Sequence, residues 1–237
     1  MNKIVRLGTR ESALAIWQAR AVEKELNQHN IITKIVKIKS DGDLNVNKPL
    51  YEFGVSGIFT KSLDIALLNN KIDIAVHSLK DVPSKPAKGI EIKSVLKRED
   101  PYDVLVIKNK NVDFNSNLRI ATSSVRRKCK WLYKFPNHII KPIRGNIDTR
   151  LKKLFNEDFD GAVFALAGLK RLGFSKNINI KILKWMVPCA SQGTIGIAGL
   201  KKDKTLDKVL KNINCDMTNR LVNEERQFIS LMKGGCS

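Results

Sequence analysis

The sequence has no long apolar run and no apolar leader segment. A stretch of about eighteen apolar residues, which a membrane-spanning helix requires, is missing. The first six residues run directly into a strand pattern and lack the apolar core of a signal peptide. These absences predict a cytoplasmic protein with no membrane partner.

Cysteine and histidine are also scarce. The four cysteines are widely spaced and form no CxxC pair, which argues against a zinc ribbon or a thioredoxin motif. Such usage is typical of an intracellular protein with reduced thiols. The three histidines are scattered, and none has a second histidine at ligand spacing. We therefore expect no metal site.

Acidic residues are few relative to basic ones: 23 Asp and Glu face 43 Lys and Arg, which gives a net charge of +20. A charge of this size is compatible with nucleic-acid binding. However, the lysines are spread over the whole chain among many Asn and Ile residues, and aromatic residues are not interleaved with them as stacking platforms. We expect no nucleic-acid partner, because a small polyanionic substrate suits the same positive field.

One apolar segment, residues 72–76, has the composition of a buried strand and leads into a polar end. Lys80 and Asp81 follow this segment, and Pro83 then stops regular structure. In α/β folds, ligands bind beyond the carboxyl ends of strands, so Asp81 is a candidate site residue. Taken alone, the pair of Lys80 and Asp81 is explained equally simply as a solvated loop pair.

Three strand–turn–helix junctions share one layout, in which hydroxyl or glycine residues and arginines surround the start of a helix. They span residues 3–29, 118–134 and 138–150. Free N–H groups, the positive end of the helix dipole and a guanidinium together favour anions. Arginine in particular binds carboxylates through two parallel hydrogen bonds. The simpler alternatives are that Arg10 is a surface charge and that Ser12 only caps a helix.

The other elements complete an α/β pattern. Strands are expected at 31–38, 90–96, 103–107 and 161–165, and helices at 58–68, 205–213 and 216–233. The glycine-bearing segment 191–196 is interpreted as a crossing back toward the first domain, and it lacks the motifs of a nucleotide site. The layout as a whole predicts two α/β domains that close on a molecule with several carboxylates.

Seven collinear segments then carry a family resemblance. They are residues 7–15, 73–83, 98–101, 122–127, 144–151, 167–173 and 234–236. Through these segments the chain closely resembles the hydroxymethylbilane synthases, also called porphobilinogen deaminases, over almost its whole length. The resemblance implies a transferase of tetrapyrrole (haem) biosynthesis that condenses four porphobilinogens head to tail, with loss of ammonia, and then releases hydroxymethylbilane by hydrolysis.

The resemblance also implies a cofactor and a set of site residues. Members of the family build on a dipyrromethane primer joined by a thioether to a cysteine, which Cys236 matches, and Asp81 matches the catalytic carboxylate. The matched cofactor contacts are Lys80, Asp81, Thr122, Ser123, Ser124, Arg126, Arg127, Arg144, Gly145 and Arg150. The matched substrate contacts are Arg10, Ser12, Arg144, Arg150, Arg171 and Gln192.

The fold implied by the resemblance is α/β, with two periplasmic-binding-protein-like domains that contain mixed sheets. Domain 1 comprises residues 1–97 and 193–212, and domain 2 comprises residues 98–192. A truncated third domain, residues 213–237, carries the cofactor cysteine. A monomer with porphobilinogen as its small-molecule partner is expected.

Two departures from the family pattern keep an alternative function open. The basic mobile loop of the family corresponds here to residues 54–59, where Ser56 replaces a lysine, and Glu52 also stands where lysine is common. In addition, the family continues well beyond the cysteine, whereas one residue follows Cys236 here. The alternative is a catalytically impaired relative that still binds polycarboxylate pyrroles.

Overall fold

The computed structural model describes residues 4–39, 60–176 and 178–232, in two compact units. Unit 1 contains the described residues up to Glu99 and from Ala190 onward, and unit 2 contains Asp100 to Cys189. Cys236 and the predicted mobile loop, residues 54–59, lie outside the described residues. The division into three domains stays a prediction.

Unit 1 is built on a five-stranded sheet with the order β2-β1-β3-β10-β4. Its elements are β1 (Val5–Arg10), α1 (Ala13–Gln28), β2 (Thr33–Ile38), α3 (Lys61–Leu68), β3 (Ile74–Ser78), the short 3-10 helix η2 (Leu79–Asp81), β4 (Ile90–Val95), β10 (Ile195–Leu200), α7 (Asp207–Asn212) and α8 (Asp216–Leu231). Strands β1, β2 and β3 are parallel, while β10 is antiparallel to both of its neighbours.

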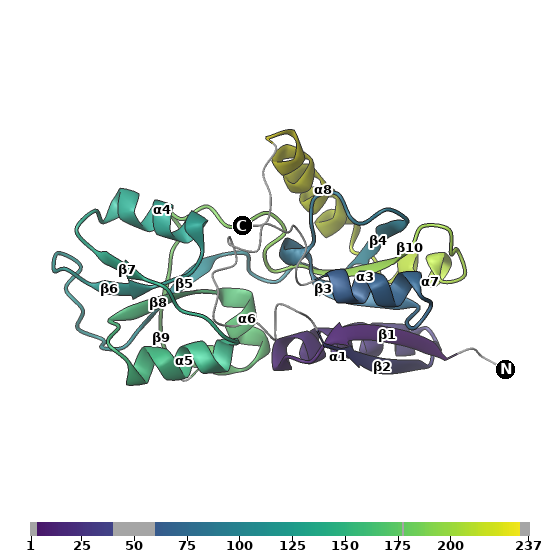
Figure 1. The fold of residues 1–237 in the computed structure, drawn as a ribbon, viewed down its shortest axis with the longest axis horizontal. Coiled ribbons are helices and arrows are strands. Elements are labelled where there is room, and N and C mark those ends of the chain that lie inside the picture. The colour runs from purple at the N-terminus through teal and green to yellow at the C-terminus, as the bar shows by residue number, and fades with distance from the viewer. Residues whose placement is uncertain (1–3, 40–59, 177, 233–237) are drawn as a thin grey trace. The chain divides into compact units, whose positions relative to one another are not determined.

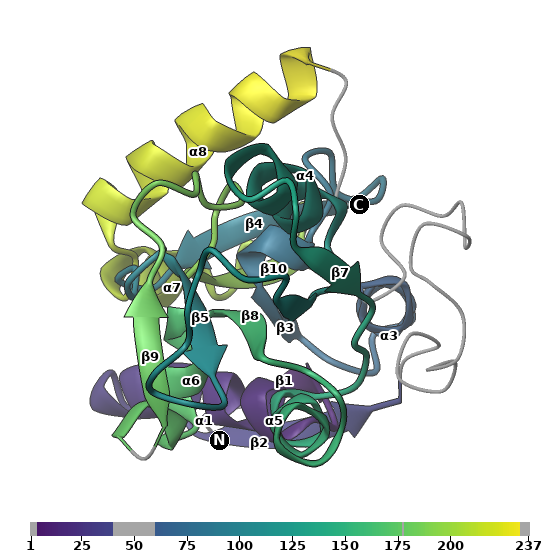
Figure 2. The same cartoon turned by 90° about the vertical axis from the view of Figure 1, so that its left-hand side faces the viewer.

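Helices cover both faces of this sheet (Figure 1). Apolar side chains of α1 and α7, among them Val22, Leu26 and Leu210, pack on one face. Leu63 and Leu67 of α3 pack on the other face. Helix α8 lies at the β4 edge, and Figure 2 shows it on the opposite side of unit 1 from β2. The sheet is therefore buried on both faces, as its apolar strands require.

Unit 2 repeats this topology with the order β7-β6-β8-β5-β9. Its elements are β5 (Asp103–Ile107), β6 (Arg119–Ala121), α4 (Val125–Lys134), β7 (Ile139–Lys141), α5 (Ile147–Asn156), β8 (Gly161–Ala165), α6 (Leu166–Arg171), the 3-10 helix η3 (Phe174–Lys176) and β9 (Asn179–Ile182). Strand β5 is antiparallel to β8 and β9, as β10 is to its neighbours in unit 1. The expected α/β fold with mixed sheets is confirmed.

Helix α4 is fixed to one face of the second sheet by Trp131, which is fully buried. The indole Nε1 of Trp131 donates to Nδ1 of His138 at 3.1 Å, and His138 Nε2 lies 3.0 Å from the carbonyl of Phe114. Helix α5 packs on the opposite face through Leu151 and Leu154 (Figure 1). The helices of the second and third predicted anion junctions, α4 and α5, are therefore packed firmly against the sheet.

The sequence predicted no strand at residues 195–200, where β10 forms a fully buried strand of the first sheet. Glycine is unfavourable in strands, and it hides the apolar alternation. Here it permits close packing, because a Cβ on Gly196 would lie 2.8 Å from Cδ1 of Leu79. The glycine of β10 thus makes room for the residue that begins η2.

No helix in residues 4–39, 60–176 and 178–232 is both long and apolar enough to cross a membrane. No group of three or more potential metal ligands occurs within those same ranges.

Candidate active site

The central feature of unit 1 is the turn that follows β3. The strand lies between β1 and β10 and ends at Ser78, and the residues Leu79, Lys80 and Asp81 form η2. Leu79 is buried at 1% exposure, while Lys80 and Asp81 are half-buried. The expectation that Asp81 lies where a strand leaves the sheet is confirmed. Its carboxylate has no hydrogen bond or ion pair with another described residue, so it remains available to a ligand.

The turn is attached to helix α1 and to the segment just before β10. The amide Nε2 of buried Gln18, on α1, donates to Oγ of Ser78 at 2.8 Å. The backbone N–H of Leu79 donates to the carbonyl of Thr194, just before β10, at 3.0 Å. These contacts fix the backbone on which Asp81 stands.

The first predicted junction also has the expected local structure. Ser12 is the N-cap of α1, and its hydroxyl accepts from the N–H of Ala15 at 3.3 Å. Buried Thr9 donates from Oγ1 to the carbonyl of Ala15 at 3.0 Å, which ties the end of β1 to the helix. Arg10, the last residue of β1, stands beside this cap. The cap is confirmed, whereas substrate contacts by Arg10 and Ser12 stay predictions.

His77, one strand position before Ser78, gives the protein a pH-dependent stability. Burial, followed by the positive charge of Arg10, lowers the pKa of His77 to about 4. The unfolded chain then takes up a proton that the folded chain excludes, so stability is full above pH 6.5 and falls as the pH drops toward 4. We expect a loss of about 3 kcal/mol across that window, measured by urea unfolding at a series of pH values.

A matched histidine provides the control for this pH dependence. His77→Leu should remove the decline between pH 6.5 and 4.5, because no buried imidazole then resists protonation. His29→Leu, at an exposed position, should leave the decline in place. Equal slopes in the two variants would contradict the assignment to His77.

In unit 2, two arginines of the second junction share one buried carboxylate. Asp103, at 0% exposure, accepts from Nε and Nη2 of Arg127 at 3.1 and 2.7 Å. Its other oxygen accepts from Nη2 of Arg126 at 2.6 Å. The sequence assigned the counter-charge of these arginines to a ligand, whereas the structure supplies one internally. Arg127 is buried, and Arg126 remains partly exposed.

Arg150, from α5, joins the same cluster. Its Nη2 donates at 2.9 Å to the carbonyl of Val163, which also accepts from Nη1 of Arg127 at 3.0 Å. The guanidinium lies 4.4 Å from the ring centroid of Phe164. Burial, followed by the charge of Arg127, lowers the pKa of Arg150 to about 9. The guanidinium groups of Arg127 and Arg150 repel each other at this carbonyl, and an anion bound beside them would offset the repulsion.

Two buried donors of this region have no hydrogen-bond partner among the residues that the structure describes. They are Nη1 of Arg144 and Nε of Arg150. A buried N–H without an acceptor costs about 1–3 kcal/mol, and more when it is charged. Carboxylate oxygens at these positions would satisfy both donors. The residues present therefore fit an anionic group with more than one carboxylate.

The hydroxyl residues of the second junction build the turn itself. Ser124 caps α4, and Thr122 Oγ1 accepts from the N–H of Ser124 at 3.2 Å. Ser123 Oγ contacts both the carbonyl and the N–H of Ile143, at 2.8 and 2.9 Å. These bonds tie the second junction to the third, and they occupy the hydroxyls that the sequence assigned to cofactor contacts. Contacts to a cofactor by these residues stay predictions.

The remaining predicted residues are positioned as follows. Gly145 has φ +113, and its missing Cβ would lie 2.9 Å from Thr149, so a side chain there would disturb the start of α5. Arg171 ends α6 and is half-buried. Gln192, in unit 1, is 1% exposed, and its backbone carbonyl accepts from Nε of Arg98 at 2.9 Å. Cys236 lies outside the described residues.

The structure therefore gathers the predicted residues into two groups, one in each unit. Lys80, Asp81, Arg10, Ser12 and Gln192 belong to unit 1, and the other described site residues belong to unit 2. Sequence analysis missed Gln18 and Asp103. An acidic residue at the head of an apolar strand, as in Asp103, was a signal for a buried ion pair that sequence analysis did not use.

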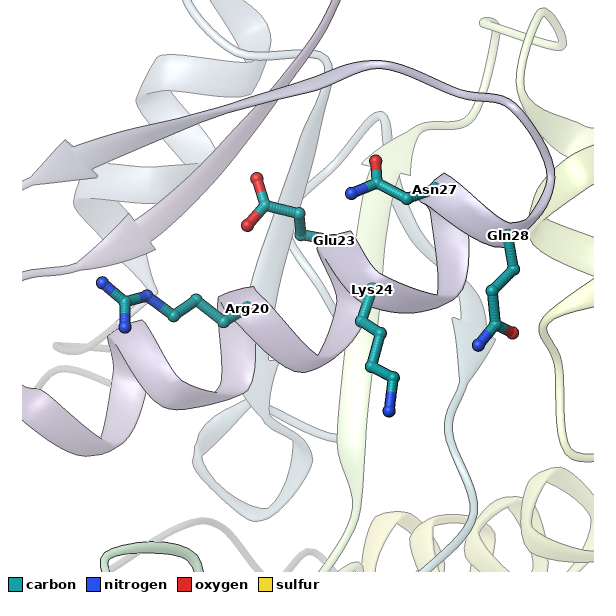
Figure 3. Close-up of a pocket in the computed structure, with 5 residues that line it drawn as sticks. All are labelled: Arg20, Glu23, Lys24, Asn27 and Gln28. Carbon is teal, nitrogen blue, oxygen red and sulfur yellow. The ribbon is translucent and has the colours of Figure 1, made fainter.

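A shallow depression also runs along the C-terminal half of α1 (Figure 3). It is lined by Arg20, Glu23, Lys24, Asn27 and Gln28. All five side chains come from one helix, and none is among the predicted site residues. It lies on the half of α1 away from Ser12, so we do not assign it to the site.

Comparison with known proteins identifies relatives over almost the whole chain. Residues 5–208 match the family model described as porphobilinogen deaminase, dipyromethane cofactor binding domain. A probable porphobilinogen deaminase of Picrophilus torridus is 44% identical over 98% of this chain and 82% of its own length. The porphobilinogen deaminase of Orientia tsutsugamushi is 41% identical over 99% of this chain and 80% of its own length.

Solved structures share the fold at low sequence identity. The VFT2 domain of Bordetella pertussis BvgS aligns with a TM-score of 0.53 at 11% identity, covering 94% of this chain and 93% of that domain. The probable amino-acid ABC transporter extracellular-binding protein YtmK of Bacillus subtilis aligns with a TM-score of 0.52 at 13% identity, covering 98% and 97%. The expected periplasmic-binding-protein-like fold is thereby confirmed.

Proposed function

The chain belongs to the porphobilinogen deaminase family, and we propose that it acts as a hydroxymethylbilane synthase. It is a transferase that joins four porphobilinogens head to tail on a dipyrromethane primer, with loss of one ammonia at each addition. Hydrolysis then releases the linear tetrapyrrole. We propose Cys236 as the thioether attachment point of the primer.

The observation that carries this proposal is the arginine cluster of unit 2. Asp103 offsets one positive charge, whereas Arg126, Arg127 and Arg150 bring three to the same region. Buried donors of Arg144 and Arg150 lack acceptors. Pyrrole units that carry acetate and propionate arms supply several carboxylates at once, and arginine forks bind them with defined orientation.

We assign these four arginines to the carboxylate arms of the primer. When bound, the primer would supply the free pyrrole carbon at which the addition of substrates begins. The hydroxyls of Thr122, Ser123 and Ser124 and the backbone at Gly145 shape the turns beneath these arms. Arg10, Ser12, Arg171 and Gln192 are proposed to hold the arms of incoming substrate.

Asp81 is proposed as the catalytic residue of unit 1. The aminomethyl nitrogen of porphobilinogen takes a proton and leaves as ammonia with the bonding electron pair, so the remaining pyrrole becomes cationic. The carboxylate of Asp81 stabilises this cation and accepts a hydrogen bond from the pyrrole N–H. After the new carbon–carbon bond forms, the displaced ring proton is lost to a base, for which Asp81 is available. Lys80 beside it is proposed to contact a carboxylate arm.

An impaired relative that binds without turnover gains no support from the described residues. Asp81 lies in the turn that follows β3, as expected, and Arg126, Arg127 and Arg150 are gathered through Asp103 and the carbonyl of Val163. Ser56 and Cys236, which motivated that alternative, lie outside the described residues. The monomeric state, the cytoplasmic location and the lack of a nucleic-acid partner remain predictions.

Intact-mass measurement of freshly purified protein tests the proposal directly. We expect a mass increase of two porphobilinogen-derived units on Cys236, and steady release of ammonia when porphobilinogen is added. Cys236→Ala should lose the added mass and the turnover together.

A second cysteine provides the control. Cys129→Ala, at an exposed position on α4, should keep both the added mass and the turnover. An unmodified Cys236 after incubation with porphobilinogen, together with no ammonia release, would contradict the proposed function. Binding of a tetrapyrrole precursor without ammonia release would favour the impaired relative instead.

A further inference from the structure

The turn that carries Asp81 combines a backbone hydrogen bond of its own with contacts from a distant part of the chain. Within η2 and the residue after it, the N–H of Val82 donates to the carbonyl of Leu79 at 3.2 Å. Pro83 has no N–H group to offer. The carbonyls of Val82, Pro83 and Ser84 accept from donors outside the turn, and this matters because an unpaired buried carbonyl is costly.

A single side chain from α8 supplies these donors. Arg226 is about 140 residues further along the chain, and its Nη1 donates to the carbonyl of Val82 at 3.0 Å. Its Nη2 donates to the carbonyls of Pro83 and Ser84, at 2.5 and 3.3 Å. A longer contact of 3.5 Å joins Nη1 to the carbonyl of Leu79. One guanidinium thus contacts four carbonyls on either side of Asp81.

The geometry of these contacts requires arginine. The guanidinium carries five donors in a rigid plane, so it can hold several carbonyls at fixed relative positions. A lysine ammonium at the same place has three rotatable donors and no fixed plane. A bond to a charged donor is also stronger than a neutral hydrogen bond. The side chain is therefore suited to fix a backbone turn. A positive charge alone is not enough for this, because the donors must also lie in a fixed plane.

We propose that Arg226 is a positioning residue for the catalytic turn, which sets the orientation of Asp81 through the carbonyls of Val82 and Pro83. This inference rests on the proposed function, because it takes Asp81 as the catalytic carboxylate. It also assigns α8 a role in turnover. The helix holds the backbone just after Asp81, while Gln18 of α1 holds the backbone before it at Ser78.

Helix α8 has other attachments to unit 1, so Arg226 is not needed simply to hold the helix. Val222 packs against Leu79, Val82 and Val95 at 1% exposure. Glu225 pairs with Nη1 of Arg98 at 2.6 Å and accepts from the N–H of Ser191, also at 2.6 Å. The Glu225 contacts do not involve the turn, so they offer a way to loosen α8 without touching Asp81.

The test compares three variants of the full-length protein. Arg226→Lys keeps the charge and should lower kcat by about 10- to 100-fold with KM changed little, because a misplaced catalytic group loses rate rather than affinity. Arg220→Lys, on the exposed side of α8, should leave both constants unchanged. Glu225→Gln should lower the melting temperature with a smaller loss of kcat.

The melting temperature separates positioning from general destabilisation. If Arg226→Lys loses more kcat than Glu225→Gln at an equal or smaller loss of melting temperature, the positioning role is supported. Equal kcat values for Arg226→Lys and Arg220→Lys, or kcat losses that simply follow the melting temperature in all variants, would overturn it. A wild-type protein that releases no ammonia would instead contradict the proposed function itself.

Discussion

Replacing Asp81 with asparagine is expected to lower the rate of ammonia release by about 100- to 10,000-fold, the range associated with a positioned acid–base group. Asparagine has nearly the same shape, but it can neither stabilise a cationic pyrrole with a full negative charge nor take up a proton. The carboxylate has no bond to another described residue, so its removal leaves no group unpaired there. The melting temperature should change by no more than about 2 °C.

Ammonia release per mole of protein measures this effect, and circular dichroism with thermal unfolding reports the fold. Asp113→Asn provides the matched control, because this exposed carboxylate in unit 2 accepts a hydrogen bond from the N–H of Asn115 that the asparagine carbonyl can keep. It should retain full turnover. An Asp81→Asn protein with more than about a tenth of the wild-type rate would show that another group stabilises the cation.

Most strands of the two sheets and the three helix starts were predictable because local chemistry specifies them. Ser12 has the side chain of an N-cap, and the structure confirms this cap. Ser124 caps α4 at the second junction, where hydroxyl residues were expected at the start of a helix. The apolar segment before Asp81 is short and bounded by a proline, so the end of β3 was correctly expected. In each case the signal lies within a few residues of the feature that it predicts.

The missed features depend on contacts between distant parts of the chain. Strand β10 escaped prediction because glycine obscures its pattern, and the reason for Gly196 is a leucine more than a hundred residues earlier. Arg226 has no local signal, since an arginine on an amphipathic helix is usually solvated. Only the folded arrangement shows that it contacts the turn around Asp81.

Asp103 illustrates how the same arginines can be both structural and functional. The sequence assigned Arg126 and Arg127 to ligand carboxylates, because arginines in the first turn oppose the helix dipole. Asp103 meets that electrostatic need in part, and it holds both guanidinium planes in place. Such a contact pre-organises the arginines for a polyanion, since their side chains need not be ordered when the ligand binds.

Asp103→Asn is accordingly expected to destabilise the protein by about 3 kcal/mol, because it leaves the buried guanidinium of Arg127 without its counter-charge. The melting temperature should fall by about 6–12 °C for a chain of this size. Loading of the primer should also decrease, as read from the intact mass, because Arg126 and Arg127 lose the group that orients them. Thermal unfolding and mass spectrometry of the same sample measure both effects.

Three further variants, Asp158→Asn, Arg127→Gln and the double variant Asp103→Asn/Arg127→Gln, decide whether the lost charge causes the instability. Asp158→Asn removes a carboxylate that pairs with Arg119 at an exposed position, so it should cost no more than about 1 kcal/mol. The double variant Asp103→Asn/Arg127→Gln removes the buried unpaired charge and should recover part of the stability lost in the single variant. If the double variant is instead destabilised by the sum of its two single changes, Asp103 stabilises unit 2 independently of Arg127, and the pre-organisation argument for this arginine is wrong.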